Sequence, residues 1–319
     1  MFNLFRSIIT LGFISSVTSC GIPCSEITDI DIPGAEIISI SGTEVANYTI
    51  APAPPLLNTP ILDLTFCNVT VVITHPGDND TVTNSIWLPP AADWNGRFQA
   101  TGGGGYSVGY GEIVLGPAVN GGYSAGSSDG GNLGNGFDLL PAALKSNGEV
   151  NWPLVQNYGS RSIHDMTVIG KAATEQYYGM APKYSYINGC SNGGRQGYMA
   201  AQKYPEDFDG VMAAAPVIYA SQVSVSVHWP YTVMVQEKTA PSECVFNEFV
   251  NASIAECDGL DGVLDGLISN LQDCNFNPYT LVGRQVECDG SSITIDETTV
   301  SQHWIHFLNS NANYKWFQS

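Results

Sequence analysis

Basic residues are scarce in this chain: 11 Lys and Arg stand against 30 Asp and Glu among 319 residues, a formal net charge of −19 at pH 7. Binding to nucleic acid or to an anionic membrane needs positive charge, so this balance argues against both kinds of partner. Charged residues of both signs make up only 13% of the chain. This composition suits a secreted protein that works in an acidic medium, where many carboxylates are neutralised.

Long apolar runs are missing after the first twenty residues, so no later stretch is expected to span a bilayer. The N-terminal stretch has Arg6, then an apolar run from Ile8 to Val17, then the small residues Thr18 and Ser19. This arrangement indicates a signal peptide over residues 1–19 that is too short and too rich in Ser and Thr for a membrane anchor. The alternative is a buried N-terminal helix, which the lack of capping signals disfavours.

The chain has eight cysteines, which fit an oxidising, extracellular compartment. N-x-S/T sequons, the acceptor motifs for N-glycosylation, agree with a secretory route, although a sequon by itself does not guarantee modification. They begin at Asn47, Asn68, Asn79 and Asn251. We therefore expect a secreted glycoprotein.

The stretch from Lys183 to Val217 has the order of elements that a nucleophile elbow requires. Residues 184–187 are predicted as a buried strand, residues 195–204 as a helix and residues 210–217 as a second buried strand. The G-x-S-x-G turn Gly189-Cys190-Ser191-Asn192-Gly193 stands between the first strand and the helix. The alternative is an ordinary glycine-rich turn, because the five-residue pattern alone also occurs by chance.

In an elbow, Ser191 would be the nucleophile at the C-terminal edge of a sheet, and the backbone N–H of Asn192 could stabilise an oxyanion. A second donor is expected from the glycine run Gly102–Tyr106, which follows a predicted strand and precedes the elbow. The predicted donors there are the N–H groups of Gly103 and Gly104. The alternative for this run is a flexible linker.

Two other polar residues invite a catalytic interpretation. Asp129 ends a predicted strand over residues 123–128, and an acid/base role competes with the more common role of a turn or capping residue. His164 lies near the start of a predicted amphipathic helix over residues 161–178. Because His164 precedes the nucleophile, whereas this architecture places the base after it, a structural role is the better interpretation.

The alternation of strand and helix stops after Val217, which indicates a separate lid domain. Residues 20–60 likewise show little periodicity. We expect a signal peptide over residues 1–19, the N-terminal part of a hydrolase core over residues 20–220 and a lid over residues 221–319.

Cysteines gather in the predicted lid, at Cys244, Cys257, Cys274 and Cys288. Four cysteines allow three sets of pairings, of which Cys257 with Cys274 is the neatest because it closes one acidic loop. Earlier in the chain, a bond from Cys24 to Cys67 could pin the N-terminal arm to the sheet.

The acidic loop CDGLDGVLDGLISNLQDC interleaves carboxylates with glycines and backbone carbonyls. Asp258, Asp261 and Asp265 supply hard oxygen ligands, which makes a Ca²⁺ site plausible, although the spacing is not that of an EF-hand. The alternative is an ordinary solvated acidic loop.

Taken together, these motifs resemble the tannase and feruloyl esterase family of secreted ester hydrolases, from about Cys24 to about Cys288. The residues that carry the resemblance are Gly102–Tyr106, Tyr158-Gly159-Ser160-Arg161 with His164, Gly189–Gly197, Tyr204–Gly210, Ala215-Pro216 and Cys257–Gly266.

The resemblance implies an α/β-hydrolase fold with an inserted lid domain and Ser191 as the nucleophile. It also implies Ca²⁺ held by the side chains of Asp258, Asp261 and Asp265 and by the carbonyls of Val263 and Leu267. The substrates it implies are phenolic acid esters, such as feruloyl esters of plant polysaccharides and galloyl esters of tannins.

The chain departs from the family pattern in its C-terminal part. The family places the triad Asp and His beyond the lid, with the His followed by a Cys that bridges to the Cys before the nucleophile. None of the five histidines here is followed by Cys. We therefore expect the triad Asp and His and the C-terminal part of the hydrolase domain to be missing, and Cys190 to lack its partner. His303 and His306 follow the nucleophile without the family pattern around them.

Three functional hypotheses follow. The first is a serine esterase acting by acyl transfer, whose base lies outside this chain. The second is a catalytically inactive, calcium-binding secreted glycoprotein that lacks the triad Asp and His. The third is a gene product that never folds.

Overall fold

The structure of the protein, a computed structural model, describes residues 21–131 and 143–300. It divides into two compact units, the first ending at Ile218 and the second beginning at Tyr219. No helix in these described ranges has the length and apolar character that a bilayer crossing demands.

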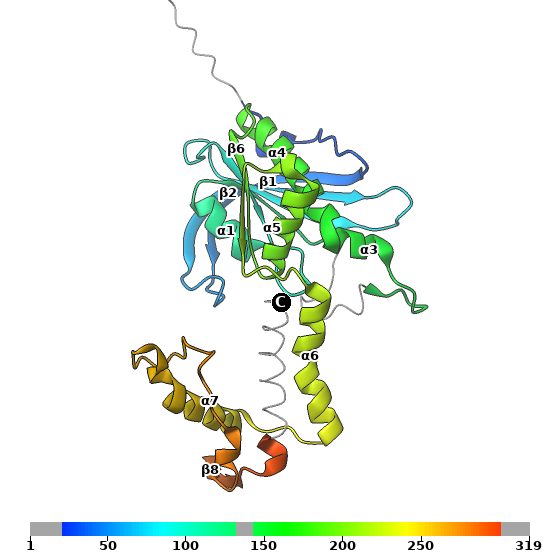
Figure 1. Ribbon diagram of the computed structural model, residues 1–319. Helices are drawn as coiled ribbons and strands as arrows, with labels where there is room; N and C mark the ends of the chain where they lie inside the picture. The colour runs from blue at the N-terminus through cyan, green and yellow to red at the C-terminus, as the bar shows by residue number, and fades with distance from the viewer. Residues whose placement is uncertain (1–20, 132–142, 301–319) are drawn as a thin grey trace, which may run out of the picture. The chain divides into compact units, whose positions relative to one another are not determined.

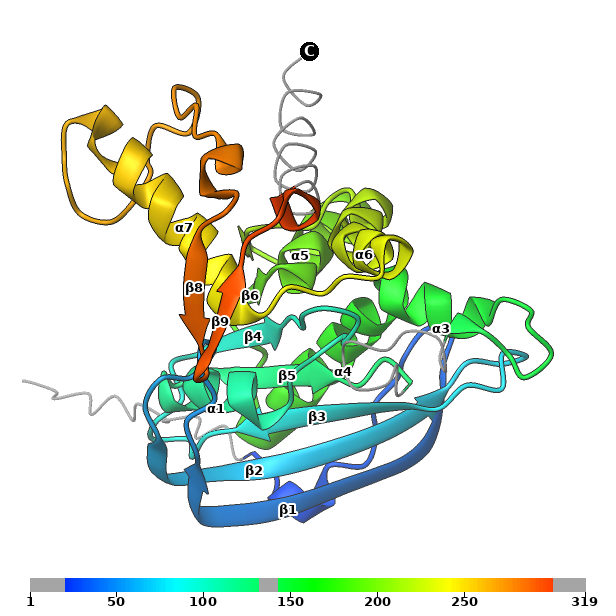
Figure 2. The same ribbon diagram turned by 90° about the horizontal axis from the view of Figure 1, so that it is seen from below.

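The first unit is built on a seven-stranded sheet with the strand order β1-β2-β3-β5-β4-β6-β7, which can be followed from β1 to β6 in Figure 2. Neighbouring strands are antiparallel from β1 to β5 and parallel from β5 to β7. The sheet is therefore mixed. Its strands are β1 (Glu36–Ile50), β2 (Ile61–Thr74), β3 (Val82–Leu88), β4 (Arg97–Thr101), β5 (Ser124–Ser128), β6 (Tyr184–Cys190) and β7 (Gly210–Ala214).

Helices cover both faces of this sheet because alternate side chains of its strands point to opposite sides. In β3, Ile86 joins Phe98 and Met166 in the core beneath α4 and α5, whereas Trp87 joins Leu115 in the core beneath α1. Figure 1 shows these helices against the sheet. The helices of this unit are η1 (Cys24–Glu26), α1 (Glu112–Asn120), α3 (Trp152–Gln156), the π-helix η2 (Asn157–Arg161), α4 (Ser162–Tyr178), α5 (Asn192–Lys203) and η3 (Pro205–Asp207).

A disulfide joins Cys24 to Cys67 and so ties the N-terminal segment to β2. The segment crosses β1 at Gly42, where a side chain would place its Cβ 1.9 Å from the carbonyl oxygen of Cys24. Only a glycine allows the two backbones to lie this close.

A buried polar cluster links the β2–β3 turn to α4. The Nδ1 atom of His75 lies 2.7 Å from an oxygen of Asp80, and its Nε2 atom lies 3.2 Å from an oxygen of Asp165. Burial raises the pKa of Asp165, although its contact with His75 opposes the shift. Arg161 pairs with Asp80 from the other side, so the buried charges are compensated.

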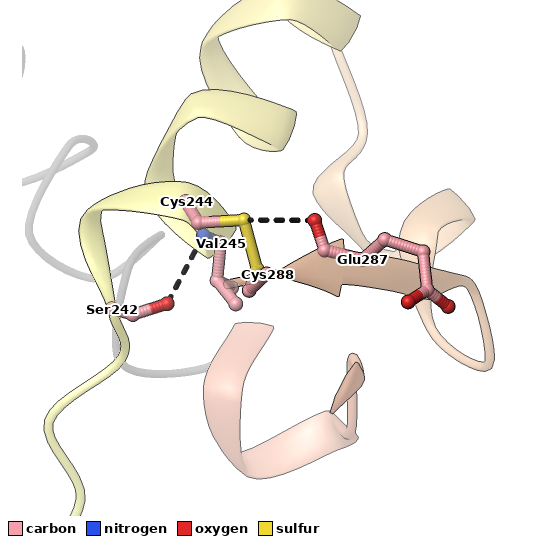
Figure 3. The surroundings of a disulfide bond; sticks show 5 residues. All are labelled: Ser242, Cys244, Val245, Glu287 and Cys288. Carbon is pink, nitrogen blue, oxygen red and sulfur yellow. Dashed lines mark hydrogen bonds between the residues drawn. A yellow bond between two sulfur atoms is a disulfide. The ribbon is translucent and has the colours of Figure 1, made fainter. Parts of the chain in front are cut away.

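The second unit has a small core of its own, which includes Val245, Phe249 and Val286. One disulfide joins Cys244, at the start of α7, to Cys288 of β8 (Figure 3). The Oγ of Ser242 caps α7 by accepting a hydrogen bond from the N–H of Val245. The elements of this unit are α6 (Ala220–Glu237), α7 (Glu243–Cys257), η4 (Asp258–Asp261), η5 (Pro278–Leu281) and the antiparallel pair β8 (Gln285–Cys288) and β9 (Ser291–Thr294).

Candidate active site

Ser191 stands alone between β6 and α5, at the point where strand turns into helix. Its backbone has φ +60° and ψ −116°. Residues other than glycine rarely adopt such a conformation, and holding one there costs about 1–3 kcal/mol. A strained serine at a strand-to-helix turn is the geometry of a nucleophile elbow.

Hydrogen bonds on both sides hold Ser191 in this conformation. Its N–H donates to the carbonyl of Ala214 at 3.0 Å, which ties it to the end of β7. Its carbonyl accepts from the N–H of Arg195 at 3.0 Å and from that of Val217 at 3.2 Å. The strained backbone is therefore fixed by the parallel neighbour strand and by the first turn of α5.

The glycines around the serine permit close approach of three backbone segments. A Cβ on Gly189 would lie 2.4 Å from the backbone of Gly193, and a Cβ on Gly102 would lie 2.6 Å from the Cα of Gly193. The turn therefore closes tightly, and the glycine loop after β4 packs directly on the start of α5.

This packing places candidate oxyanion donors around the elbow. Asn192 is the first residue of α5, where backbone N–H groups have no intrahelical acceptor. Within the described ranges, the N–H groups of Asn192 and Gly104 have no hydrogen-bond acceptor. The N–H of Gly103, by contrast, donates to the Oε1 of Gln196 at 3.0 Å. Of the two donors predicted in the glycine loop, only Gly104 keeps an available N–H.

The side chain of Asn192 points into a network that braces the elbow. Its amide donates to the carbonyl of Ser107 and accepts from the Nε of Arg195 at 2.7 Å. The guanidinium of Arg195 also donates to the carbonyls of Tyr158 and Gly159, and it stacks 4.5 Å from the Tyr158 ring. Burial lowers the pKa of Arg195. This cation joins the π-helix η2 to the elbow through backbone carbonyls.

Neither histidine of the first described unit hydrogen-bonds Ser191. The two ring nitrogens of His75 are engaged in the buried cluster with Asp80 and Asp165. His164 makes a 2.7 Å hydrogen bond to Asp207 and stacks on Tyr204, at the opposite end of α5 from Ser191. The structural interpretation of His164 agrees with these contacts.

The remaining catalytic candidates lie elsewhere. Asp129 lines a polar cavity of about 420 Å³, but its carboxylate accepts from the N–H groups of Thr83 and Gly131, both at 2.8 Å, as a turn residue does. His303 and His306 lie outside the described residues. Cys190 is exposed and is the free cysteine of the described chain.

The acidic loop of the second unit is closed by a disulfide between Cys257 and Cys274. Each of the three carboxylates predicted as ligands accepts hydrogen bonds from backbone N–H groups of the same loop through one oxygen; these carboxylates belong to Asp258, Asp261 and Asp265. The donor set is chemically suited to Ca²⁺. Among the residues described, however, these carboxylates do not come within 4.8 Å of one another as a group, so a bound ion would have to draw them together.

Comparison of the chain with known proteins connects this site to a family. The family model described as "Tannase and feruloyl esterase" matches residues 67–313. The chain is 49% identical over 282 residues to a probable feruloyl esterase of Arthroderma benhamiae, a match that covers 88% of this chain and 52% of that protein. It is 34% identical over 242 residues to a tannase of Aspergillus oryzae, a match that covers 72% of this chain and 39% of that protein.

Solved structures agree with the sequence matches. A tannin acyl hydrolase from Aspergillus niger superposes with a TM-score of 0.73 at 28% identity, covering 91% of this chain and 53% of that one. Feruloyl esterase B from Aspergillus oryzae gives a TM-score of 0.66 at 25% identity and covers 86% of this chain and 53% of that one. The fold of the chain is the α/β-hydrolase fold, as predicted. The chain spans about half the length of the relatives it matches.

Proposed function

Since the chain belongs to the tannase and feruloyl esterase family, we propose that it serves carboxylic ester hydrolysis with Ser191 as the nucleophile. The observation that supports this most strongly is the strained backbone of Ser191 between β6 and α5. The available N–H groups of Asn192 and Gly104 add to it, because they can hold a developing oxyanion.

The reaction is an acyl transfer in two halves. The Oγ of Ser191 attacks the ester carbonyl carbon as its proton passes to a general base, and the carbonyl oxygen becomes an oxyanion held by backbone N–H groups. The intermediate collapses, the alcohol leaves with the proton and an acyl-serine remains. Water, deprotonated by the same base, then releases the free acid and restores the hydroxyl.

Neither His75 nor His164 of the first unit hydrogen-bonds Ser191. Ring nitrogens of the two are instead engaged with Asp80, Asp165 and Asp207. His303 and His306 follow Ser191 in sequence and are candidates for the general base within the chain. Without a base the serine hydroxyl stays protonated and is a poor nucleophile.

The substrates we propose are esters of phenolic acids. The relatives are described as feruloyl esterase and tannase. A secreted location is supported by three disulfides in the described chain, which persist in oxidising compartments.

Hydrolysis of methyl ferulate and methyl gallate by the purified chain tests this proposal. The Ser191→Ala variant should lose all turnover above background, whereas Ser226→Ala, which alters an exposed serine of α6, should keep it. Equal rates from the parent chain and Ser191→Ala would overturn the role of Ser191.

A structural calcium ion in the second unit is part of the proposal. Asp258, Asp261 and Asp265, with the carbonyls of Val263 and Leu267, would hold it and so fix the loop between Cys257 and Cys274. Calcium at about a hundred times its Kd should then stabilise the unit by about 2.7 kcal/mol. Thermal unfolding in CaCl₂ and in EDTA measures this, with Asp261→Asn as the variant that should abolish the difference.

A second candidate function is a secreted calcium-binding glycoprotein without catalysis. The engagement of both first-unit histidines, His75 and His164, with carboxylates rather than with Ser191 favours it. Calcium-dependent unfolding together with no Ser191-dependent turnover would select this function over the esterase.

A further inference from the structure

Gly103 is held by α5 at both of its backbone groups. Its N–H donates to the Oε1 of Gln196 at 3.0 Å, and its carbonyl accepts from the N–H of Gly193 at 2.8 Å. The glycine loop therefore cannot shift along the elbow without breaking hydrogen bonds to the helix that follows the nucleophile.

Gln196 bridges two points of the same loop. Its side chain is fully buried, and its Nε2 donates to the carbonyl of Val108 at 3.0 Å. Both partners are backbone groups, one a donor and one an acceptor, so the amide has a single satisfied orientation. A carboxylate of the same size could accept from Gly103 but could not donate to Val108.

These bonds engage the N–H of Gly103 and leave that of Gly104 available. Gly103 is fully engaged, and the next residue, Gly104, accepts from the N–H of Ser107 at 3.0 Å while its own N–H has no acceptor in the described chain. The side chain of Asn192 holds the far end of this turn through the carbonyl of Ser107.

We propose that Gln196 is a positioning residue, which fixes the glycine loop so that the N–H of Gly104, rather than that of Gly103, completes the oxyanion hole with the N–H of Asn192. This inference rests on the function proposed above. Gln196 does not touch the reacting atoms and acts through the backbone of Gly103.

The Gln196→Glu variant tests the inference by its response to pH. Burial raises the pKa of a carboxyl group, so the new side chain is ionised at high pH and protonated at low pH. Only the protonated acid can donate to Val108. Titratable groups on the adjoining segments include Arg195, Tyr110 and Cys190, and the hydrogen bonds of the Gln196 side chain go instead to the backbone of Gly103 and Val108.

The prediction is a fall in kcat of about 100-fold for Gln196→Glu at pH 8, with KM little changed, because losing one oxyanion donor typically costs this much. Activity should recover toward the parent value at pH 5. Gln196→Met should be impaired at both pH values, because it can neither accept nor donate. Gln202→Glu makes the same chemical change at an exposed position of the same helix and should behave like the parent.

Hydrogen–deuterium exchange of peptides covering residues 102–108 supplies a readout that needs no turnover. Exchange there should be faster in Gln196→Glu than in Gln202→Glu at pH 8. If the parent chain shows no hydrolysis, the proposed function fails, and this exchange still decides the inference. Unchanged exchange, or a loss of kcat that is equal at both pH values and accompanied by a lower Tm, would overturn it.

Discussion

At the scale of single residues, Gly189 is a position in the site where an added side chain would clash directly with the backbone. This residue ends the buried part of β6 and faces the backbone of Gly193 across the turn. The turn around Ser191 can close in this way only because Gly189 carries no side chain.

Gly189→Ala should therefore destabilise the first unit. The added Cβ would meet backbone atoms at 2.4 Å, and inserting a methyl group into a packed site costs about 1–3 kcal/mol. Urea denaturation measures the change in unfolding free energy. Gly159→Ala is the matched control, because its Cβ would meet nothing within 4 Å, and it should be close to neutral. Equal effects of the two substitutions would contradict the account of the turn.

His164 gives the fold a pH-dependent contact. Its hydrogen bond to Asp207 raises its pKa, although burial opposes the shift. The bound proton stabilises the folded state fully below the pKa of an unfolded histidine, about 6.5, and this contribution is lost as pH rises through the higher folded pKa.

His164→Gln should accordingly lower Tm most at pH 5, and the difference from the parent should narrow at alkaline pH. Thermal unfolding across that pH range measures this. His228→Gln, at an exposed histidine of α6, serves as the control and should show no such trend. A Tm difference for His164→Gln that stays constant with pH would rule out the proton-linked contact.

Whether the role of a residue could be predicted from the sequence depends on how far apart along the chain its contacts lie. The elbow around Ser191 is local, so strand, turn and helix were predictable from 35 consecutive residues. The contact of Gln196 with Gly103 joins residues 93 positions apart. Nothing in the local pattern marks Gln196, because a buried glutamine and a solvated one look alike in a sequence.

At the scale of elements, the strands around the nucleophile turn were predictable and the outer strand β1 was not. The strand predicted as buried over residues 210–217 is β7, which covers only Gly210–Ala214 at the other edge of the sheet and exposes Val211 and Met212. β4, at residues 97–101, directly precedes the glycine run, where a strand was predicted, and β5, at residues 124–128, lies within the strand predicted over residues 123–128. β1 was missed because it is a 15-residue edge strand with mostly exposed side chains, so it lacks a regular apolar alternation. The helices α6 and α7 were missed because residues 218–319 show no clear periodicity.

The four sequons differ in how exposed their asparagines are in the fold. Asn68 lies in β2 between two paired strands, and its Oδ1 is buried. The other three are exposed. In a eukaryotic secretion host we predict glycans on Asn47, Asn79 and Asn251 and none on Asn68.

Mass spectrometry before and after enzymatic deglycosylation measures this occupancy. Each of the variants Asn47→Gln, Asn79→Gln and Asn251→Gln should lose one glycan, and Asn68→Gln should lose none. A glycan on Asn68 of the folded, secreted chain would contradict the register of β2.

At the scale of the whole molecule, the chain combines a hydrolase core with a disulfide-rich second unit. Its formal net charge is −19 at pH 7, which disfavours association with anionic surfaces. It spans about half the length of the relatives it matches. In the proposed function, the described part of the chain carries Ser191 as the nucleophile and the N–H groups of Asn192 and Gly104 as oxyanion donors.

Covalent labelling tests whether Ser191 is the nucleophile. The purified chain is incubated with a fluorophosphonate, which phosphonylates activated serines, and the modified peptide is identified by tandem mass spectrometry. An adduct on Ser191 that forms much more slowly in Gln196→Met and at the parent rate in Gln202→Glu is the predicted result. An unmodified Ser191, with label absent or carried by other serines to the same extent, would contradict the assignment of this residue as the nucleophile.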